Sequence, residues 1–356
     1  MNAKLVLENG LEFYGFSFGY EKSTSGEVVF NTGMVGYNES LTDPSYAGQI
    51  LCFTYPLIGN YGVPKKVLEN DLIKNFESHK IQVQGLVVND YSYNYSHHNS
   101  SKSLGDWLKE EKVPGIFGVD VRELTKTLRE KGTMLGKIII NNEDISLYDP
   151  NKENLVSFVS IHKPITYGKH GKKVLLIDCG VKNNIIHSLL KRNVQVIRVP
   201  WDYDFFAKDT ALDFDGIVIS NGPGDPKMCV ATINNVRKAI EQEIPIFGIC
   251  LGNQILALAS GADTYKLKYG HRGQNQPSYI VGEKRCFMTS QNHGFAVNES
   301  TLQKDWLPWM RNANDNTNEG LRHKNKPFFS VQFHPEANPG PTDTAFIFDE
   351  FVKVIK

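Results

Sequence analysis

The segment FGICLGNQ, residues 247–254, decides the fold, because it joins an apolar strand to an apolar helix through one cysteine. The run before the cysteine, PIFGIC, is continuously apolar, as is typical of strands buried on both faces of a parallel sheet. The run after it, LGNQILALASG, has the apolar spacing of a helix. Glycines two positions before and after Cys250 leave room for a sharp turn. The segment therefore predicts a strand, a tight turn and a helix, with Cys250 at the turn.

Strands and helices alternate on both sides of this segment, throughout residues 172–356. The predicted strands include KVLLIDCG (173–180), VQVIRVP (194–200) and DGIVIS (215–220), and amphipathic helical runs separate them. Such alternation predicts an α/β domain with a mostly parallel sheet covered by helices on both faces. In these sheets reactive groups gather at the carboxyl ends of the strands, which is where Cys250 lies.

The first part of the chain has a different pattern. Residues 1–150 contain short strand-like runs separated by turn glycines, such as KLVLENG, GEVVFNTG and QILCFTYP, and predict a mixed, strand-rich domain. One helix is indicated at residues 120–131, with Asp120 as N-cap and Gly132 as stop. Residues 151–171 lose this periodicity and are predicted to be a linker.

Composition excludes several classes of protein. Lys+Arg and Asp+Glu are equal, at 39 each, so the chain lacks the basic excess of a protein whose main partner is nucleic acid. The five cysteines are scattered and form no CxxC pair, which argues against a disulfide framework or a zinc knuckle and favours the cytoplasm. The N-terminus has no signal-peptide pattern. The longest apolar stretch, residues 245–262, carries Asn253 and Gln254, so we expect core and no membrane span.

Cys250 has two possible roles, a small core residue or a nucleophile. A helix N-terminus stabilises a thiolate, and its free N–H groups can receive a developing oxyanion. FFSVQFHPE brings His334 to the end of a late strand, at the same edge of the sheet, and Glu336 follows two residues later. Together they predict a thiol nucleophile, a base and a carboxylate that orients the base.

Other motifs are weaker taken by themselves. SNGPGDP (220–226) ends a predicted strand. It is typical of an ordinary turn, and it could also expose backbone N–H groups. It lacks the spacing of a phosphate-binding loop. His97 and His98 are expected in a polar loop, where two adjacent histidines without a third ligand make a weak metal site.

The motifs together resemble one family. GICLGNQ and HPE are similar to the nucleophile and base motifs of class I glutamine amidotransferases. SNGPGDP, SQNHGFAV (290–297) and HPEANPGPTDTAFIFDEF resemble the glutaminase part of carbamoyl-phosphate synthetase. In the first half, GEVVFNTGMVGYNESLTDPSYAGQI, YPLIGNYG and GVDVRELTKTLREKGTMLG resemble the N-terminal domain specific to the small subunit of that enzyme.

The resemblance implies a role for each motif residue. Cys250 would attack the side-chain amide of glutamine, His334 would transfer the proton and Glu336 would orient His334. The N–H groups of Gly222 and Leu251 would form the oxyanion hole. The residues expected to hold glutamine are Ser45, Gly224, Gln254, Asn292, Gly294 and Phe295.

The implied reaction yields glutamate and ammonia through a γ-glutamyl thioester. The ammonia would pass to a carbamoyl-phosphate synthetase large subunit or fused domains, for pyrimidine or arginine synthesis, with residues 1–150 as the docking domain. ATP, bicarbonate and Mg²⁺ are expected only on that partner, and this chain is expected to hold no cofactor and no metal. Asn253 replaces a frequent histidine, with a small expected effect. HRGQNQP and NDNTNEG are closer to eukaryotic fused synthetases than to bacterial small subunits.

Two alternatives to this function stay open at this point. A stand-alone amidase or γ-glutamyl hydrolase on the same fold would need no partner. A non-catalytic regulatory subunit would keep a vestigial triad.

Overall fold

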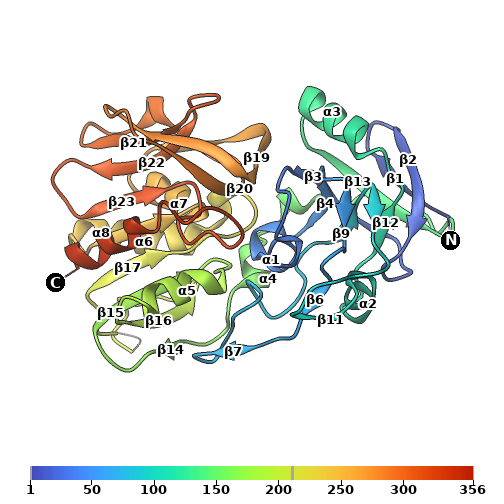
Figure 1. Cartoon of the computed structure of the whole chain (residues 1–356). Helices are drawn as coiled ribbons and strands as arrows, with labels where there is room; N and C mark the ends of the chain where they lie inside the picture. Colours follow the sequence, from blue (N-terminus) through green and yellow to red (C-terminus); the bar gives the residue numbers. More distant parts are fainter. Residues whose placement is uncertain (1, 210–211, 356) are drawn as a thin grey trace. The chain divides into compact units, whose positions relative to one another are not determined.

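The computed structural model describes residues 2–209 and 212–355, which form two compact units (Figure 1). Unit 1 contains the chain up to Glu69 together with Ile73–Glu153. Unit 2 contains Asn70–Leu72 together with the chain from Asn154 onward. The two units are described separately below.

Unit 1 is built on a closed barrel with the strand order β1-β13-β3-β4-β9-β12-β2. The pairs β3-β4, β4-β9 and β9-β12 are parallel, and the other pairs are antiparallel. The expected strand-rich character of this part is therefore confirmed. The barrel strands are β1 (Asn2–Leu7), β2 (Glu12–Ser17), β3 (Thr24–Asn31), β4 (Gln49–Phe53), β9 (Gly85–Val87), β12 (Gly115–Phe117) and β13 (Met134–Ile140).

Helices and short strands complete unit 1. The predicted helix is α3 (Val121–Lys131): the Asp120 side chain accepts a hydrogen bond from the Glu123 N–H at 2.9 Å, and Gly132 follows the last turn. The other elements are α1 (Tyr37–Thr42), η1 (Pro44–Tyr46), α2 (Leu104–Glu110), η2 (Pro150–Lys152), β5 (Leu57–Ile58), β6 (Val63–Pro64), β7 (Leu68–Glu69), β10 (Asp90–Tyr91) and β11 (Ser100–Lys102). The short strand β8 (Leu72–Ile73) has its first residue in unit 2 and its second in unit 1.

The described part of unit 2 contains a ten-stranded sheet with the order β14-β16-β15-β17-β18-β23-β22-β21-β19-β20. In this sheet order, the neighbouring strands β16-β15-β17-β18-β23 pair in parallel, as the sequence predicts. The strands on either side of them pair antiparallel. The strands are β14 (Ile165–Tyr167), β15 (Lys172–Asp178), β16 (Val194–Pro200), β17 (Gly216–Ile219), β18 (Ile246–Ile249), β19 (Asp263–Ile280), β20 (Cys286–Asn298), β21 (Trp306–Asn312), β22 (Asn318–His323) and β23 (Phe328–Val331).

Helices cover both faces of the parallel part. On β15, Val174 and Leu176 pack into one core cluster with α5 and α8, whereas Leu175 and Ile177 pack into the other with α6 and α7. This alternation is the period-2 pattern of a strand buried on both faces. The predicted α/β fold class is thus confirmed. The helices are α4 (Val156–Val159), α5 (Asn183–Leu190), α6 (Val230–Glu241), α7 (Leu251–Ala259), α8 (Phe346–Val354), η3 (Pro226–Met228) and η4 (Glu299–Thr301).

Two features differ from the sequence-based expectation. Residues 263–323 form long antiparallel strands beside β23, because consecutive strands joined by short turns pair antiparallel. The segment predicted as a linker holds α4 and the edge strand β14, which pairs with β16. Within the described residues, no helix has the length and apolar character needed to cross a membrane. The domain boundaries themselves stay a prediction.

Candidate active site

Cys250 occupies the turn between β18 and α7. Its backbone has φ 55° and ψ −104°, a conformation that costs a residue other than glycine about 1–3 kcal/mol. The Cys250 N–H donates to the Val331 carbonyl of β23 at 2.8 Å, which joins the turn to the neighbouring parallel strand. The thiol is buried, and its sulfur lies 3.8 Å from the Asn292 carbonyl oxygen. A strained, buried cysteine at this position is the geometry of a nucleophile.

The two glycines that flank Cys250 are required by close backbone approach. A Cβ at position 248 would lie 2.5 Å from the Gly252 carbonyl oxygen. A Cβ at position 252 would lie 2.2 Å from the Ile219 carbonyl oxygen of β17. Neither contact is possible for a real side chain, so the turn can form only with glycine at both positions.

His334 and Glu336 follow the end of β23. The His334 N–H donates to the Ser290 carbonyl at 2.9 Å, and its Nδ1 lies 2.7 Å from Glu336 Oε1. Burial alone would lower the pKa of His334, but the Glu336 carboxylate and the nearby Cys250 raise it to about 10. His334 Nε2 is buried, and the Cys250 thiol is a side-chain hydrogen-bond neighbour of the ring. The ring is therefore held by Glu336 and can carry a proton taken from the thiol.

Lys182 is a member of the site that the sequence did not reveal. Its Nζ donates to Glu336 Oε1 at 3.1 Å and to the Ala337 carbonyl at 2.6 Å, and its side chain is 3% exposed. Burial alone would raise the pKa of Glu336, but Lys182 and His334 lower it to about 2. The lysine stands 154 positions before the glutamate, so no local pattern connects them. The buried carboxylate is thus stabilised by a cation on each side.

The predicted oxyanion donors are neighbours in the structure. Leu251 begins α7, and the first N–H groups of a helix have no partner within it. A Cβ at position 222 would lie 2.0 Å from the Cys179 carbonyl oxygen and 2.8 Å from the Leu251 side chain. Gly222 therefore packs against the residue that follows the nucleophile. Gly224 lies in the same loop with φ +82°, where glycine is favoured.

Several of the predicted glutamine-binding residues lie together beside Cys250. Asn292, Gly294 and Phe295 belong to β20, and Asn292 contacts the Cys250 sulfur through its carbonyl oxygen. The Gln254 side chain donates from Nε2 to the Phe295 carbonyl at 2.8 Å, which ties α7 to β20. The structure thus brings four predicted residues to one place.

Asn253 and Ser45 are buried in different units of the chain. Asn253 is fully buried and connects α7 to the end of β23, donating to Gln332 Oε1 at 3.0 Å and accepting from Ser330 Oγ at 2.7 Å. This residue therefore has a structural role outside the triad. Ser45 lies in η1 of unit 1, buried, with its N–H bonded to Asp43 Oδ1. Its assignment to the glutamine site stays a prediction.

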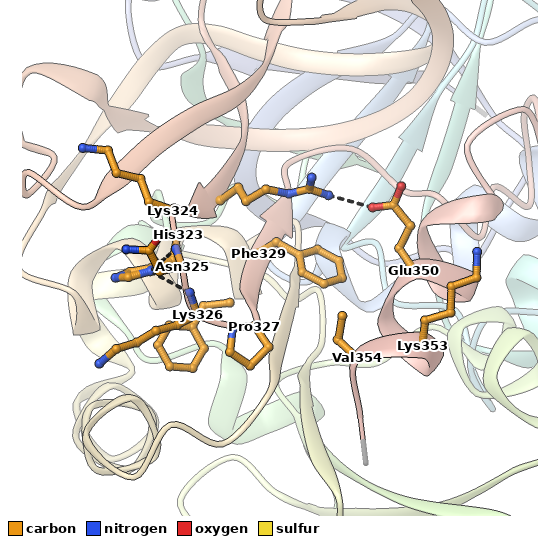
Figure 2. Close-up of a pocket in the computed structure, with 11 residues that line it drawn as sticks. His323, Lys324, Asn325, Lys326, Pro327, Phe329, Glu350, Lys353 and Val354 are labelled. Carbon is orange, nitrogen blue, oxygen red and sulfur yellow. Dashed lines mark hydrogen bonds and ion pairs between the residues drawn. The ribbon is translucent and has the colours of Figure 1, made fainter.

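A pocket of about 640 Å³ lies at the other end of β23 (Figure 2). It is formed by the residues that precede and begin this strand together with the end of α8, whereas His334 follows the carboxyl end of the strand. An ion pair of 2.7 Å joins Arg322 and Glu350 across it. This pocket contains none of the three residues Cys250, His334 and Glu336.

Comparison with known proteins gives two family matches. Residues 5–138 match the family "Carbamoyl-phosphate synthase small chain, CPSase domain", and residues 175–354 match "Glutamine amidotransferase class-I". The chain is 52% identical to the "Carbamoyl phosphate synthase arginine-specific small chain" of Saccharomyces cerevisiae, covering 98% of this chain and 87% of that one.

Longer relatives match over a part of their length. The chain is 54% identical to "Multifunctional protein CAD" of Squalus acanthias, over 99% of this chain and 16% of that protein. It is 51% identical to "Carbamoyl-phosphate synthase [ammonia], mitochondrial" of Homo sapiens, over 99% of this chain and 24% of that protein. The chain thus spans less than a quarter of these two curated relatives.

Proposed function

The chain belongs to the family of carbamoyl-phosphate synthase small chains with a class I glutamine amidotransferase domain, and on this premise we propose that it hydrolyses L-glutamine to supply ammonia. The observation that carries the proposal is the strained, buried Cys250 beside a histidine held 2.7 Å from Glu336. A cysteine serving only as core packing would need neither the positive φ nor a histidine held by a buried carboxylate.

The first half of the reaction forms the thioester. The Cys250 thiol gives its proton to His334 Nε2, and the sulfur attacks the amide carbon of glutamine. The negative charge that develops on the carbonyl oxygen is stabilised by the N–H groups of Gly222 and Leu251. The C–N bond then breaks as His334 returns its proton to the departing nitrogen, which leaves as ammonia.

The second half regenerates the enzyme. Water gives a proton to His334 and attacks the γ-glutamyl thioester, again through an oxyanion held by the same two N–H groups. The C–S bond breaks, glutamate leaves and the sulfur regains its proton. Glu336 accepts the His334 Nδ1–H bond throughout and stabilises each imidazolium. Lys182 keeps Glu336 ionised and in place.

The substrate contacts are part of the same proposal. The glutamine amide would sit between the Cys250 turn and β20, where Asn292, Gly294 and Phe295 lie. Gln254 supports this strand through the Phe295 carbonyl and would hold the substrate with it. Ser45 and Gly224 are proposed as further contacts.

The proposed use of the ammonia is carbamoyl phosphate synthesis on a synthetase partner, either a separate large chain or fused domains. This partner and its docking to unit 1 are supported by the names of the relatives and by the small-chain family match over residues 5–138. Bicarbonate, ATP and Mg²⁺ would act on the partner. A cytoplasmic location is supported by five free cysteines, four of them buried.

Glutamate release from the purified chain tests this proposal, with Cys250→Ala as the control and with the partner present or absent. We expect slow release by the native chain, faster release with the partner and none above background by Cys250→Ala. Equal release by both proteins under both conditions would refute the catalytic role. Equal release by the native chain with and without the partner would instead identify a stand-alone hydrolase.

A further inference from the structure

Two histidines and a glutamate form a buried cluster in the antiparallel part of the unit 2 sheet, which Figure 1 shows in orange. His271 lies on β19, His293 on β20 and Glu319 on β22, and each is less than 9% exposed. Their ligand atoms all lie within 4.8 Å of one another. His271 and His293 are directly opposite in the β19-β20 register, and their rings meet edge to face at 5.0 Å.

Each of the two histidines has a hydrogen-bond partner on one ring nitrogen outside the cluster. His271 Nε2 lies 2.9 Å from Asp315 Oδ2, and His293 Nδ1 lies 2.8 Å from the Phe295 carbonyl oxygen. Histidines that bind metals almost always donate their second N–H to a carboxylate or a backbone carbonyl in this way. On the inner side, His271 Nδ1 lies 3.5 Å from Glu319 Oε1, and His293 Nε2 lies 3.1 Å from Gln291 Oε1.

Acceptor atoms face one another inside the cluster. Glu319 Oε1 accepts from the Asn312 amide at 3.1 Å, but its buried Oε2 has no hydrogen-bond partner among the described residues. His293 Nδ1 donates its proton to the Phe295 carbonyl oxygen, which can only accept. With the ring proton on Nδ1, His293 Nε2 and Gln291 Oε1 are both acceptors, and a cation between them would satisfy both.

We propose that His271 Nδ1, His293 Nε2 and Glu319 Oε2 bind one divalent transition-metal ion, with Gln291 Oε1 as the fourth ligand. Two imidazoles and a carboxylate suit zinc and its neighbours, whereas calcium and magnesium prefer sets made only of oxygen. Bonds of about 2.0–2.2 Å place tetrahedral ligands roughly 3.4 Å apart, so movements of about 1 Å complete the set.

The charge around the cluster is compatible with a divalent ion. Asp315 and Glu319 supply two negative charges beside His271, and the positive charge of Arg272 acts on His293. The bound ion would take the lone pair of His271 Nδ1. The Asn312 amide, 3.4 Å from that nitrogen, then donates to Glu319 alone.

The ion would tie β19 and β22 to β20 at a defined position. His293 stands between Asn292 and Gly294, and its ring holds the Phe295 carbonyl. The bound ion would therefore fix the strand segment that contacts Cys250, without touching the reacting atoms. This role is structural, and it holds whether or not glutamine is the substrate.

A zinc titration of the full chain tests the site directly. After treatment with a chelator and its removal, isothermal titration should show one Zn²⁺ bound per chain, and Co²⁺ should give the visible absorption of a tetrahedral complex. Glu319→Gln and His271→Asn should each abolish binding over the same concentration range. Asp315→Asn, which removes the partner of a ligand, should weaken binding by about 10–100-fold.

The matched control removes the exposed histidine pair, whose rings lie 4.3 Å apart. The double variant His97→Ala/His98→Ala should bind Zn²⁺ as the native chain does. Equal binding by the native chain and Glu319→Gln, or binding lost in the double variant, would refute the proposal. Glu319→Gln preserves the shape of the side chain, and circular dichroism shows whether each variant is folded. Because no glutamine is used, this result is independent of the glutaminase assay.

Discussion

Lys182→Met removes one partner of the buried ion pair with Glu336 and leaves the carboxylate in place. Losing one partner of such a pair costs about 3–5 kcal/mol. Glu336 keeps His334 at 2.7 Å as a second partner, so we expect the lower end of this range, about 3 kcal/mol. That is roughly a hundredfold change in the equilibrium constant for unfolding.

The assay is denaturant unfolding followed by tryptophan fluorescence. Trp201, Trp306 and Trp309 lie in unit 2 and only Trp107 lies in unit 1, so the signal reports mainly on unit 2. Lys238→Met is the matched control, because Lys238 pairs with Asp204 at 3.4 Å and both side chains are about half exposed. We expect this control to lose at most about 1 kcal/mol.

A double variant, Lys182→Met/Glu336→Gln, removes both charges of the pair. We expect it to recover part of the stability lost by Lys182→Met, since no uncompensated carboxylate is then buried. Equal destabilisation of unit 2 by Lys182→Met and Lys238→Met would show that the buried Lys182–Glu336 pair contributes no more than an exposed pair.

Three further predictions concern the same site. The pKa of His334 is raised from 6.5 to about 10, so protonation of this ring stabilises the folded chain fully below pH 6.5. This contribution is lost as the pH rises from 6.5 through about 10. The unfolding free energy of His334→Asn should therefore decline less steeply than that of the native chain between these pH values. Gly252→Ala should destabilise unit 2 in denaturation assays and slow the alkylation of Cys250 in labelling assays. The control Gly282→Ala, with open space around the new Cβ, should lose only about 1 kcal/mol of unfolding free energy. Equal effects of the two substitutions would contradict the steric argument. Gln254→Leu removes the hydrogen bond to the Phe295 carbonyl and should raise KM for glutamine about tenfold in steady-state kinetics, and an unchanged KM would count against its proposed role.

The elements that the sequence predicts well are those with local causes. The helix 121–131 has its cap and stop within twelve residues, and the buried strands read as continuous apolar runs. The Cys250 turn is recognisable because the glycines that permit it stand two positions away. Cys250 and His334 meet because parallel strands end at one edge of a sheet, so this pairing follows from the strand pattern.

The features that the sequence does not predict depend on contacts between distant segments. Lys182 precedes a helix, where a lysine ordinarily lies in water, and only the folded chain buries it against Glu336. The order of the antiparallel strands brings His271, His293 and Glu319 together, although they are separated along the chain. The register shifts in the β19-β20 pair interrupt the regular alternation by which a long strand is recognised.

In the proposed reaction, Cys250 forms a covalent intermediate with glutamine. Acid quenching during turnover, followed by mass spectrometry of the peptide containing Cys250, tests it most directly. We predict that this peptide gains the mass of one γ-glutamyl group, that the gain disappears when glutamine is exhausted, and that Cys250→Ala shows neither the adduct nor glutamate release. Glutamate release by Cys250→Ala at the rate of the native chain, or a γ-glutamyl group found on another residue, would contradict the account.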